Sequence, residues 1–289
     1  MRCSICPRAC GADRSGKMGF CRCPQEPVVA RAALHFWEEP CISGKNGSGA
    51  IFFCGCSLRC VFCQNSDISR DASSGKRIST GELALIMKRL EEQGAHNINF
   101  VNPTHYADAI ISTCKIYRPK IPIVYNSGGY DSVETLKKLE GIVDIYLPDY
   151  KYADNALAKR FSGADDLPEI THKAIAEMIR QTGPAQYDEN GMMTRGALIR
   201  HLILPGHVMN SIAVLKRIGQ LESTPVSIMA QYTPKNDLSE FPELQRKLTQ
   251  EELDRVTRFV ERHGIEGYIQ SLESAGEGYI PAFDGTGVS

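Results

Sequence analysis

Residues 50–65 read AIFFCGCSLRCVFCQN, an apolar run that passes directly into a loop with closely spaced cysteines. The apolar part predicts a buried strand, and Cys56, Cys60 and Cys63 follow it with the spacing C-x3-C-x2-C. Thiolates on one short loop suit an iron–sulfur cubane whose fourth iron stays open, because a structural zinc site normally takes four protein ligands. A zinc knuckle or a set of buried structural cysteines is the alternative.

The rest of the chain alternates short apolar runs with amphipathic segments of helical length. The expected strands are 50–53, 97–101, 121–125, 142–147, 198–204, 225–232 and 267–270. The expected helices are 80–93, 106–117, 132–139, 172–182, 210–221 and 249–263, the first of them behind a capping pair, Ser79 and Glu82. Such alternation builds parallel βα units with right-handed crossovers. About six units predict an α/β fold, a partial (βα)6 TIM-like barrel, rather than the eight units of a closed barrel.

Composition narrows the class of protein. The chain has 289 residues and a formal net charge of −1, with a pI near 6.7. This balance lacks the electrostatic footprint of a dedicated nucleic-acid or membrane-surface binder, so we expect neither partner. No apolar stretch approaches the ~18 residues of a membrane span, and the first residues lack the apolar region of a signal peptide. We therefore expect a cytoplasmic protein.

A second group of cysteines lies near the N-terminus. Ten of the eleven cysteines fall within residues 3–63, which indicates metal binding in a reducing compartment. We divide the chain into a cysteine-rich N-terminal extension, 1–48, and a partial barrel, 49–289. Thiols with zinc-ribbon-like spacing in the extension are Cys3, Cys6, Cys10 and Cys21. We expect zinc on these four thiols, and an auxiliary iron–sulfur cluster or a metal-free reduced state is the alternative.

Polar residues stand at the ends of several expected strands. The segments are NPTH at 102–105, YNSGG at 125–129, DIYLPDYK at 144–151, IRHLILPG at 199–206 and AQY at 230–232. Because barrel active sites lie at the carboxyl ends of the strands, these segments should surround the cysteine loop.

The residues from 49 to 65 resemble the cluster loop of the radical S-adenosylmethionine (SAM) superfamily. The polar segments extend the resemblance over nearly the whole chain, which is similar to the branch of the pyruvate formate-lyase activating enzymes. The resemblance implies that Cys56, Cys60 and Cys63 hold a [4Fe–4S] cluster whose open iron binds the amino and carboxylate groups of S-adenosyl-L-methionine.

The resemblance also implies SAM contacts residue by residue. Phe62 is implied to pack near the adenine, with core packing as the alternative. Asn102 and Thr104 occupy the place where the family often has a Gly-Gly-Glu contact to the methionine amine, although that motif is absent here. The positions implied to hold the ribose and the methionine carboxylate are Asn126, Asp149, Lys151 and Arg200. Gln231 stands where the activating enzymes often carry histidine.

Elementary chemistry supports part of this assignment. A bound zwitterionic amino acid needs a cation for its carboxylate, which Lys151 or Arg200 can supply. Ribose hydroxyls suit acceptors such as Asn126 and Asp149. The alternative is an ordinary salt bridge at the rim, because Asp149 and Lys151 share one strand face and can simply pair.

The implied activity is that of a radical SAM oxidoreductase. One electron from a flavodoxin- or ferredoxin-type donor reduces the cluster, SAM splits into methionine and a 5′-deoxyadenosyl radical, and that radical abstracts hydrogen. The implied hydrogen donor is a glycine of a glycyl radical enzyme. A small molecule or another protein or peptide is the alternative, and a non-catalytic zinc or iron–sulfur scaffold is the alternative of another class.

Overall fold

The computed structural model describes residues 2–276, 278 and 280–288. Its main sheet contains, in spatial order, β3 (Lys76–Arg77), β1 (Val28–His35), β2 (Ser48–Phe53), β4 (Ile98–Val101), β5 (Ile123–Ser127), β6 (Ile145–Pro148), β8 (Met193–Ala197) and β7 (Gln186–Tyr187). A second sheet contains β11 (Gly267–Ile269), β10 (Val226–Met229) and β9 (Ile199–Leu202). The predicted α/β fold is therefore confirmed.

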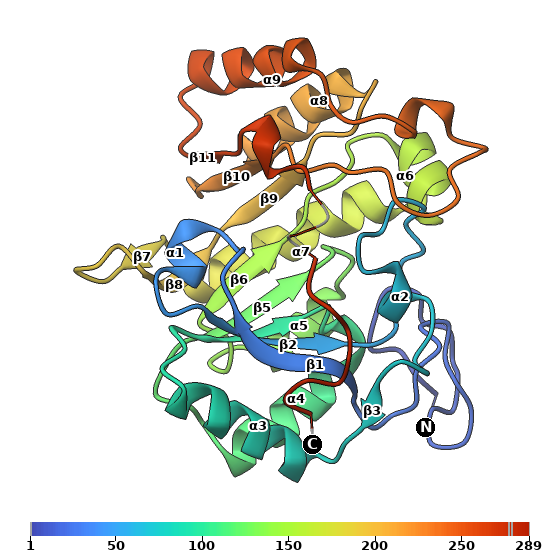
Figure 1. The fold of residues 1–289 in the computed structure, drawn as a ribbon, viewed down its shortest axis with the longest axis vertical. Coiled ribbons are helices and arrows are strands. Elements are labelled where there is room, and N and C mark those ends of the chain that lie inside the picture. The colour runs from blue at the N-terminus through green and yellow to red at the C-terminus, as the bar shows by residue number, and fades with distance from the viewer. Residues whose placement is uncertain (1, 277, 279, 289) are drawn as a thin grey trace.

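The parallel strands form one series across the two sheets (Figure 1). β2, β4, β5 and β6 pair in parallel, and β6 then pairs in parallel with β8. The chain runs from β8 into β9, which pairs in parallel with β10, as β10 does with β11. A parallel bridge between Asp149 and Arg200 joins the end of β6 to β9. The carboxyl ends of these strands therefore share one edge.

Helices connect and cover the strands. They are α1 (Pro40–Ser43), α2 (Ser66–Ser69), α3 (Thr80–Glu92), α4 (Ala107–Ile116), α5 (Val133–Lys138), α6 (Asn155–Ser162), α7 (Leu167–Thr182), α8 (Val208–Ile218) and α9 (Gln250–Arg262), with the 3-10 turns η1 (Thr104–Tyr106), η2 (Pro242–Leu244) and η3 (Leu272–Ser274). The capping box before α3 is confirmed, because Ser79 Oγ accepts from the Glu82 N–H at 3.2 Å and the Glu82 carboxylate accepts from the Ser79 N–H at 2.7 Å. In the described part of the chain, no helix has both the length and the apolar character needed to cross a membrane.

Several elements depart from the expected alternation: α6 and the short strands β3, β7 and β8 were not expected, and α7 and β1 differ as follows. α7 begins at Leu167, ahead of the expected start at 172, because Pro168 is tolerated in the first turn of a helix. β1 was not expected, since no βα unit leads to it, and it pairs antiparallel with β2. Part of the predicted extension therefore hydrogen-bonds into the main sheet, and the division at residue 48 stays a prediction.

Candidate active site

A cavity of about 240 Å³ lies at the carboxyl edge of the parallel strands. Cys56, Cys60 and Cys63 line it, each from the loop that follows β2. The predicted SAM-contact residues on its wall are Phe62, Asn102, Asn126, Asp149, Lys151, Arg200 and Gln231. The structure thus brings the cysteine loop and the polar strand ends to one place.

The cysteine loop begins at Gly55. Gly55 has a φ of +77°, and a Cβ there would collide with the Cys23 sulfur and the Cys21 carbonyl, so the position requires glycine. Asn102, with a φ of +58°, donates its side-chain amide to the Gly55 carbonyl. Asparagine adopts this backbone conformation more readily than most residues. The N-terminal segment and the end of β4 therefore fix the start of the loop from two sides.

Each sulfur of the loop has a polar neighbour. The contacts are the Leu58 N–H to Cys56 Sγ at 3.3 Å, the Ser69 hydroxyl to Cys63 Sγ at 3.4 Å, and Cys60 Sγ with the Ser162 hydroxyl at 3.0 Å. Hydrogen bonds to sulfur are among the interactions that tune iron–sulfur clusters. Three sulfurs on one cavity wall, each with such a neighbour, fit a cluster held by three thiolates.

Burial raises the pKa of the Cys56 and Cys60 thiols, and the Lys151 cation partly offsets this for both. A thiol with a raised pKa keeps its proton at neutral pH. Because the thiolate is the form that binds iron, cluster binding at this loop must release protons.

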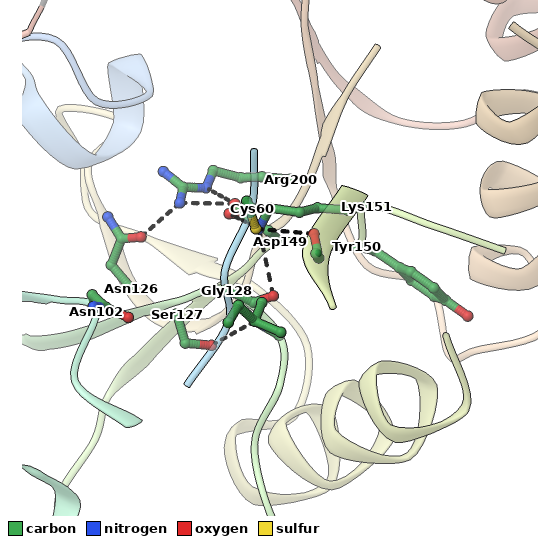
Figure 2. Close-up of polar contacts among 12 residues, drawn as sticks. Cys60, Asn102, Asn126, Ser127, Gly128, Asp149, Tyr150, Lys151 and Arg200 are labelled. Carbon is green, nitrogen blue, oxygen red and sulfur yellow. Dashed lines mark hydrogen bonds and ion pairs between the residues drawn. The ribbon is translucent and has the colours of Figure 1, made fainter. Parts of the chain in front are cut away.

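A charged network lines the same cavity and lies beside Cys60 (Figure 2). Lys151 Nζ donates to Asp149 Oδ2 at 2.6 Å, and Arg200 Nε donates to Asp149 Oδ1 at 2.9 Å. Arg200 Nη2 also donates to Asn126 Oδ1 at 2.6 Å. The salt-bridge alternative for Asp149 and Lys151 is therefore present, but both side chains still line the cavity.

The cations decide the charge of Asp149. Burial raises the pKa of its carboxyl, but Arg200 and Lys151 outweigh this effect and hold the pKa below its ordinary value. The Asp149 carboxylate likewise raises the pKa of Lys151 against the effect of burial. The site therefore holds a fixed carboxylate between two fixed cations at neutral pH.

Glu38 also belongs to this network, and the sequence did not indicate it. Its Oε2 accepts from Arg200 Nη1 at 3.1 Å, and its Oε1 accepts from the side-chain amides of Asn126 at 3.0 Å and Asn99 at 3.3 Å. Burial raises the pKa of Glu38, and Arg200 offsets part of that rise. The residue comes from the irregular segment between β1 and α1, so no strand-end pattern marks it.

Thr104 is the predicted contact residue that the structure does not bring to the cavity. It lies in η1, is buried, and donates its hydroxyl to Asp131 Oδ1 at 2.7 Å. Asp131 also accepts from the Ser127 and Tyr125 hydroxyls. Thr104 therefore serves a buried polar cluster beneath the strand ends, which the NPTH pattern alone does not reveal.

The two remaining predicted residues, Phe62 and Gln231, also line the cavity. Phe62 is buried and packs edge-on against Tyr232, with ring centroids 6.1 Å apart. Gln231 follows β10, and its carbonyl accepts from Gln64 at 3.4 Å. Phe62 therefore packs in the core, which was the alternative to an adenine contact, and it also lines the cavity.

The N-terminal cysteines lie in an irregular segment held to the fold by Arg14. The buried Arg14 guanidinium donates to the carbonyls of Cys23, Pro24 and His105. Burial raises the pKa of Cys6 to about 11, and its thiol neighbours Cys21, Cys3 and Cys10 add to the rise. Among the described residues, no group of three or more His, Cys, Asp or Glu converges as the ligands of one metal ion would. This holds for the described cysteines of the loop after β2 as well, so both metal sites stay predictions.

Comparison with known proteins gives the family. A sequence profile described as the Radical SAM superfamily matches residues 50–196. The chain belongs to the radical SAM superfamily. It is also 31% identical over 274 residues to the uncharacterized protein MJ0674 of Methanocaldococcus jannaschii, covering 91% of this chain and 75% of that protein. The matched profile includes the cysteine loop and the strands from β2 to β6.

Solved structures of similar fold are more distant. Streptococcus suis SuiB bound to its precursor peptide SuiA is 14% identical, with a TM-score of 0.48, over 75% of this chain and 46% of that one. HydG, a maturase of the [FeFe]-hydrogenase, is 15% identical, with a TM-score of 0.49, over 76% of this chain and 48% of that one. The chain spans about half the length of both proteins. Likenesses this distant say nothing about substrate or partner.

Proposed function

We propose that this superfamily member binds a [4Fe–4S] cluster on Cys56, Cys60 and Cys63 and cleaves S-adenosyl-L-methionine reductively. The observation that carries the proposal is the shared cavity, in which the cysteine loop meets the cations Lys151 and Arg200. Zinc bound only for structural reasons would need no such charged strand ends beside it.

Residues of the chain bind and orient the substrate. When bound, the cluster supplies the electron that splits SAM into methionine and a 5′-deoxyadenosyl radical. Lys151 and Arg200 offer the cations for the methionine carboxylate, and Asn126 and Asp149 offer acceptors for the ribose hydroxyls. Because these charges are held by each other before SAM arrives, little reorganisation is needed on binding.

We further propose that the parallel series from β2 to β11 is the partial (βα)6 barrel. Its support is the parallel pairing from β2 to β8 in one sheet and from β9 to β11 in the other, with the Asp149–Arg200 bridge joining the two sheets. In this reading the N-terminal cysteines lie outside the barrel and bind zinc or an auxiliary cluster. The support for a metal there is that Cys3, Cys10 and Cys21 all lie near enough to Cys6 to raise its pKa, although the described sulfurs do not converge on one point.

For the hydrogen donor we propose a protein or peptide segment, of which a glycine loop of a glycyl radical enzyme is the case that the resemblance implies. Trp37, 58% exposed, lines the cavity, and Phe36 beside it is 48% exposed. Exposed aromatic residues at a rim are typical of protein interfaces. A peptide copying a glycyl radical loop, with deuterium on its glycine, should pass the label to 5′-deoxyadenosine; transfer only from added small molecules would favour the small-molecule alternative.

The cleavage proposal is tested by replacing all three loop cysteines with alanine. The reconstituted wild-type protein should form 5′-deoxyadenosine from SAM and dithionite, and the triple variant should form none, because no ligand for the cluster remains. Circular dichroism and a thermal melt establish that the variant is folded. A folded triple variant that still forms the product would overturn the proposal.

A further inference from the structure

A second cavity, of about 200 Å³, lies on the other side of the cysteine loop. Its lining residues are Phe20, Cys21 and Arg22 of the N-terminal segment, and Cys56, Leu58, Arg59, Ser69 and Arg70. Three of these, Cys56, Leu58 and Ser69, also line the larger cavity. The cysteine loop therefore borders both cavities.

Arginine side chains dominate this second opening. Arg22, Arg59 and Arg70 line it and are exposed. Arg8 lies beside them, because its guanidinium carbon and that of Arg59 are 4.4 Å and 4.2 Å from the centre of the Phe20 ring. The chain as a whole has a net charge of −1, so this concentration of positive charge is local.

Among the described residues, none of these arginines forms an ion pair with a carboxylate. The arginine ion pairs in that part of the chain involve Arg31, Arg77, Arg118, Arg160, Arg180, Arg200, Arg217 and Arg246. Backbone carbonyls hold the group in place instead: Arg22 donates to the Arg70 carbonyl at 2.9 Å, and Arg70 donates to that of Val61 at 3.2 Å. Asp71 is the carboxylate near Arg22, and it is fully exposed and bonded to Ser73.

We propose that this arginine-rimmed cavity is the docking site of an acidic protein that passes one electron to the cluster past Cys56. The inference rests on the proposed function, since it requires the cluster. The donor loses one electron, the cluster gains it, and no covalent bond forms or breaks at the docking surface. The larger cavity must hold SAM and the hydrogen donor, so the electron donor needs another route to the cluster. The arginine-rimmed cavity offers such a route, because the cluster ligand Cys56 lines it.

The test measures how fast an acidic donor reduces the reconstituted full-length protein. Reduced flavodoxin and reduced ferredoxin, both acidic, are mixed with the protein in a stopped-flow instrument at about 20 mM and about 500 mM salt. With at least one of them, the wild-type rate should fall about tenfold or more at high salt, and R22E/R59E should show a similar loss at low salt. Dithionite-driven formation of 5′-deoxyadenosine should not change in that variant, because dithionite needs no protein docking.

Matched variants separate charge from folding. R22K/R59K keeps the charge and should reduce at nearly the wild-type rate. R258E/R262E makes the same change of charge on exposed arginines of α9, far from the N-terminal segment in Figure 1, and should have little effect. The docking site would be overturned if salt did not change the rate at which either donor reduces the wild-type protein. It would also be overturned if both donors reduced R22E/R59E as fast as the wild type. Failure of the wild type to cleave SAM with dithionite would instead overturn the proposed function.

Discussion

The two cysteine regions contain the same reactive group in different surroundings. The loop with Cys56, Cys60 and Cys63 follows a buried strand and faces the charged ends of neighbouring strands across a cavity. The thiols from residue 3 to residue 21 lie in an irregular segment held by Arg14 to backbone carbonyls. Chemistry on a substrate needs converging binding groups, and only the first setting supplies them among the residues described here.

The two regions nevertheless touch. Arg8 donates to the Ser57 carbonyl at 2.9 Å, and the Cys23 thiol donates to the Cys54 carbonyl at 3.0 Å. The N-terminal segment therefore supports the back of the cluster loop. We expect damage in the N-terminal region to lower stability, and damage in the cavity to lower activity.

The largest effect is expected from Arg200→Met. The change removes a cation that Asp149 and Glu38 share, which should slow 5′-deoxyadenosine formation about 100-fold and lower the free energy of unfolding by about 3–5 kcal/mol. Arg118→Met is the matched control, because Arg118 pairs at 2.9 Å with Asp144, which directly precedes β6 as Asp149 directly follows it. The Arg118–Asp144 pair is more exposed to solvent than the Arg200–Asp149 pair. Removing the Arg118–Asp144 pair should lower the free energy of unfolding by about 0–1 kcal/mol and leave 5′-deoxyadenosine formation unchanged. If the Arg200→Met variant formed 5′-deoxyadenosine at the wild-type rate, the charged network would have no role in SAM cleavage.

A smaller effect, on stability, is expected from Cys6→Ala. If the N-terminal thiols hold a structural metal, the variant should lose it and unfold about 2–4 kcal/mol more easily, a Tm decrease of roughly 4–15 °C. Cleavage per bound iron–sulfur cluster should stay within about twofold of the wild type. Cys114→Ala, on α4 and outside both regions, is the control. Full loss of cleavage in a folded Cys6→Ala protein would mean that the second site takes part in electron transfer.

The smallest effect is expected from Glu38→Gln. Glutamine can still accept from the amides of Asn99 and Asn126, but it no longer holds Arg200 with a charge. The KM for SAM should rise about five- to tenfold, worth about 1 kcal/mol, with kcat little changed. Glu177→Gln is the control, since Glu177 is a buried carboxylate that pairs with Arg180 and does not line the cavity. A lower kcat with an unchanged KM would place Glu38 in the chemical step instead.

Much of the site was predictable because it follows strand ends. The spacing of the cysteines and the alternation of strands and helices depend on local sequence order, and so do the positions of Asp149 directly after β6, Asn126 near the end of β5 and Arg200 within β9. Parallel strands then bring their carboxyl ends together without further information. The capping box at Ser79 is equally local, and it was also predictable.

The remainder depends on contacts across the chain. Glu38 meets Arg200 across 162 positions and lies in a segment without regular structure, so no pattern announces it. Thr104 follows a strand as expected, but the turn η1 directs its hydroxyl to Asp131. The arginine-rimmed cavity is hidden in a sequence whose total charge is near zero.

One measurement tests the central claim most directly: metal analysis and a SAM cleavage assay on a single anaerobic preparation of the wild-type protein. After reconstitution with iron and sulfide, we predict about four irons and about one zinc per chain, and 5′-deoxyadenosine formed from SAM when dithionite is added. Well-folded protein that takes up no iron and forms no 5′-deoxyadenosine would contradict the account and leave a zinc-binding scaffold.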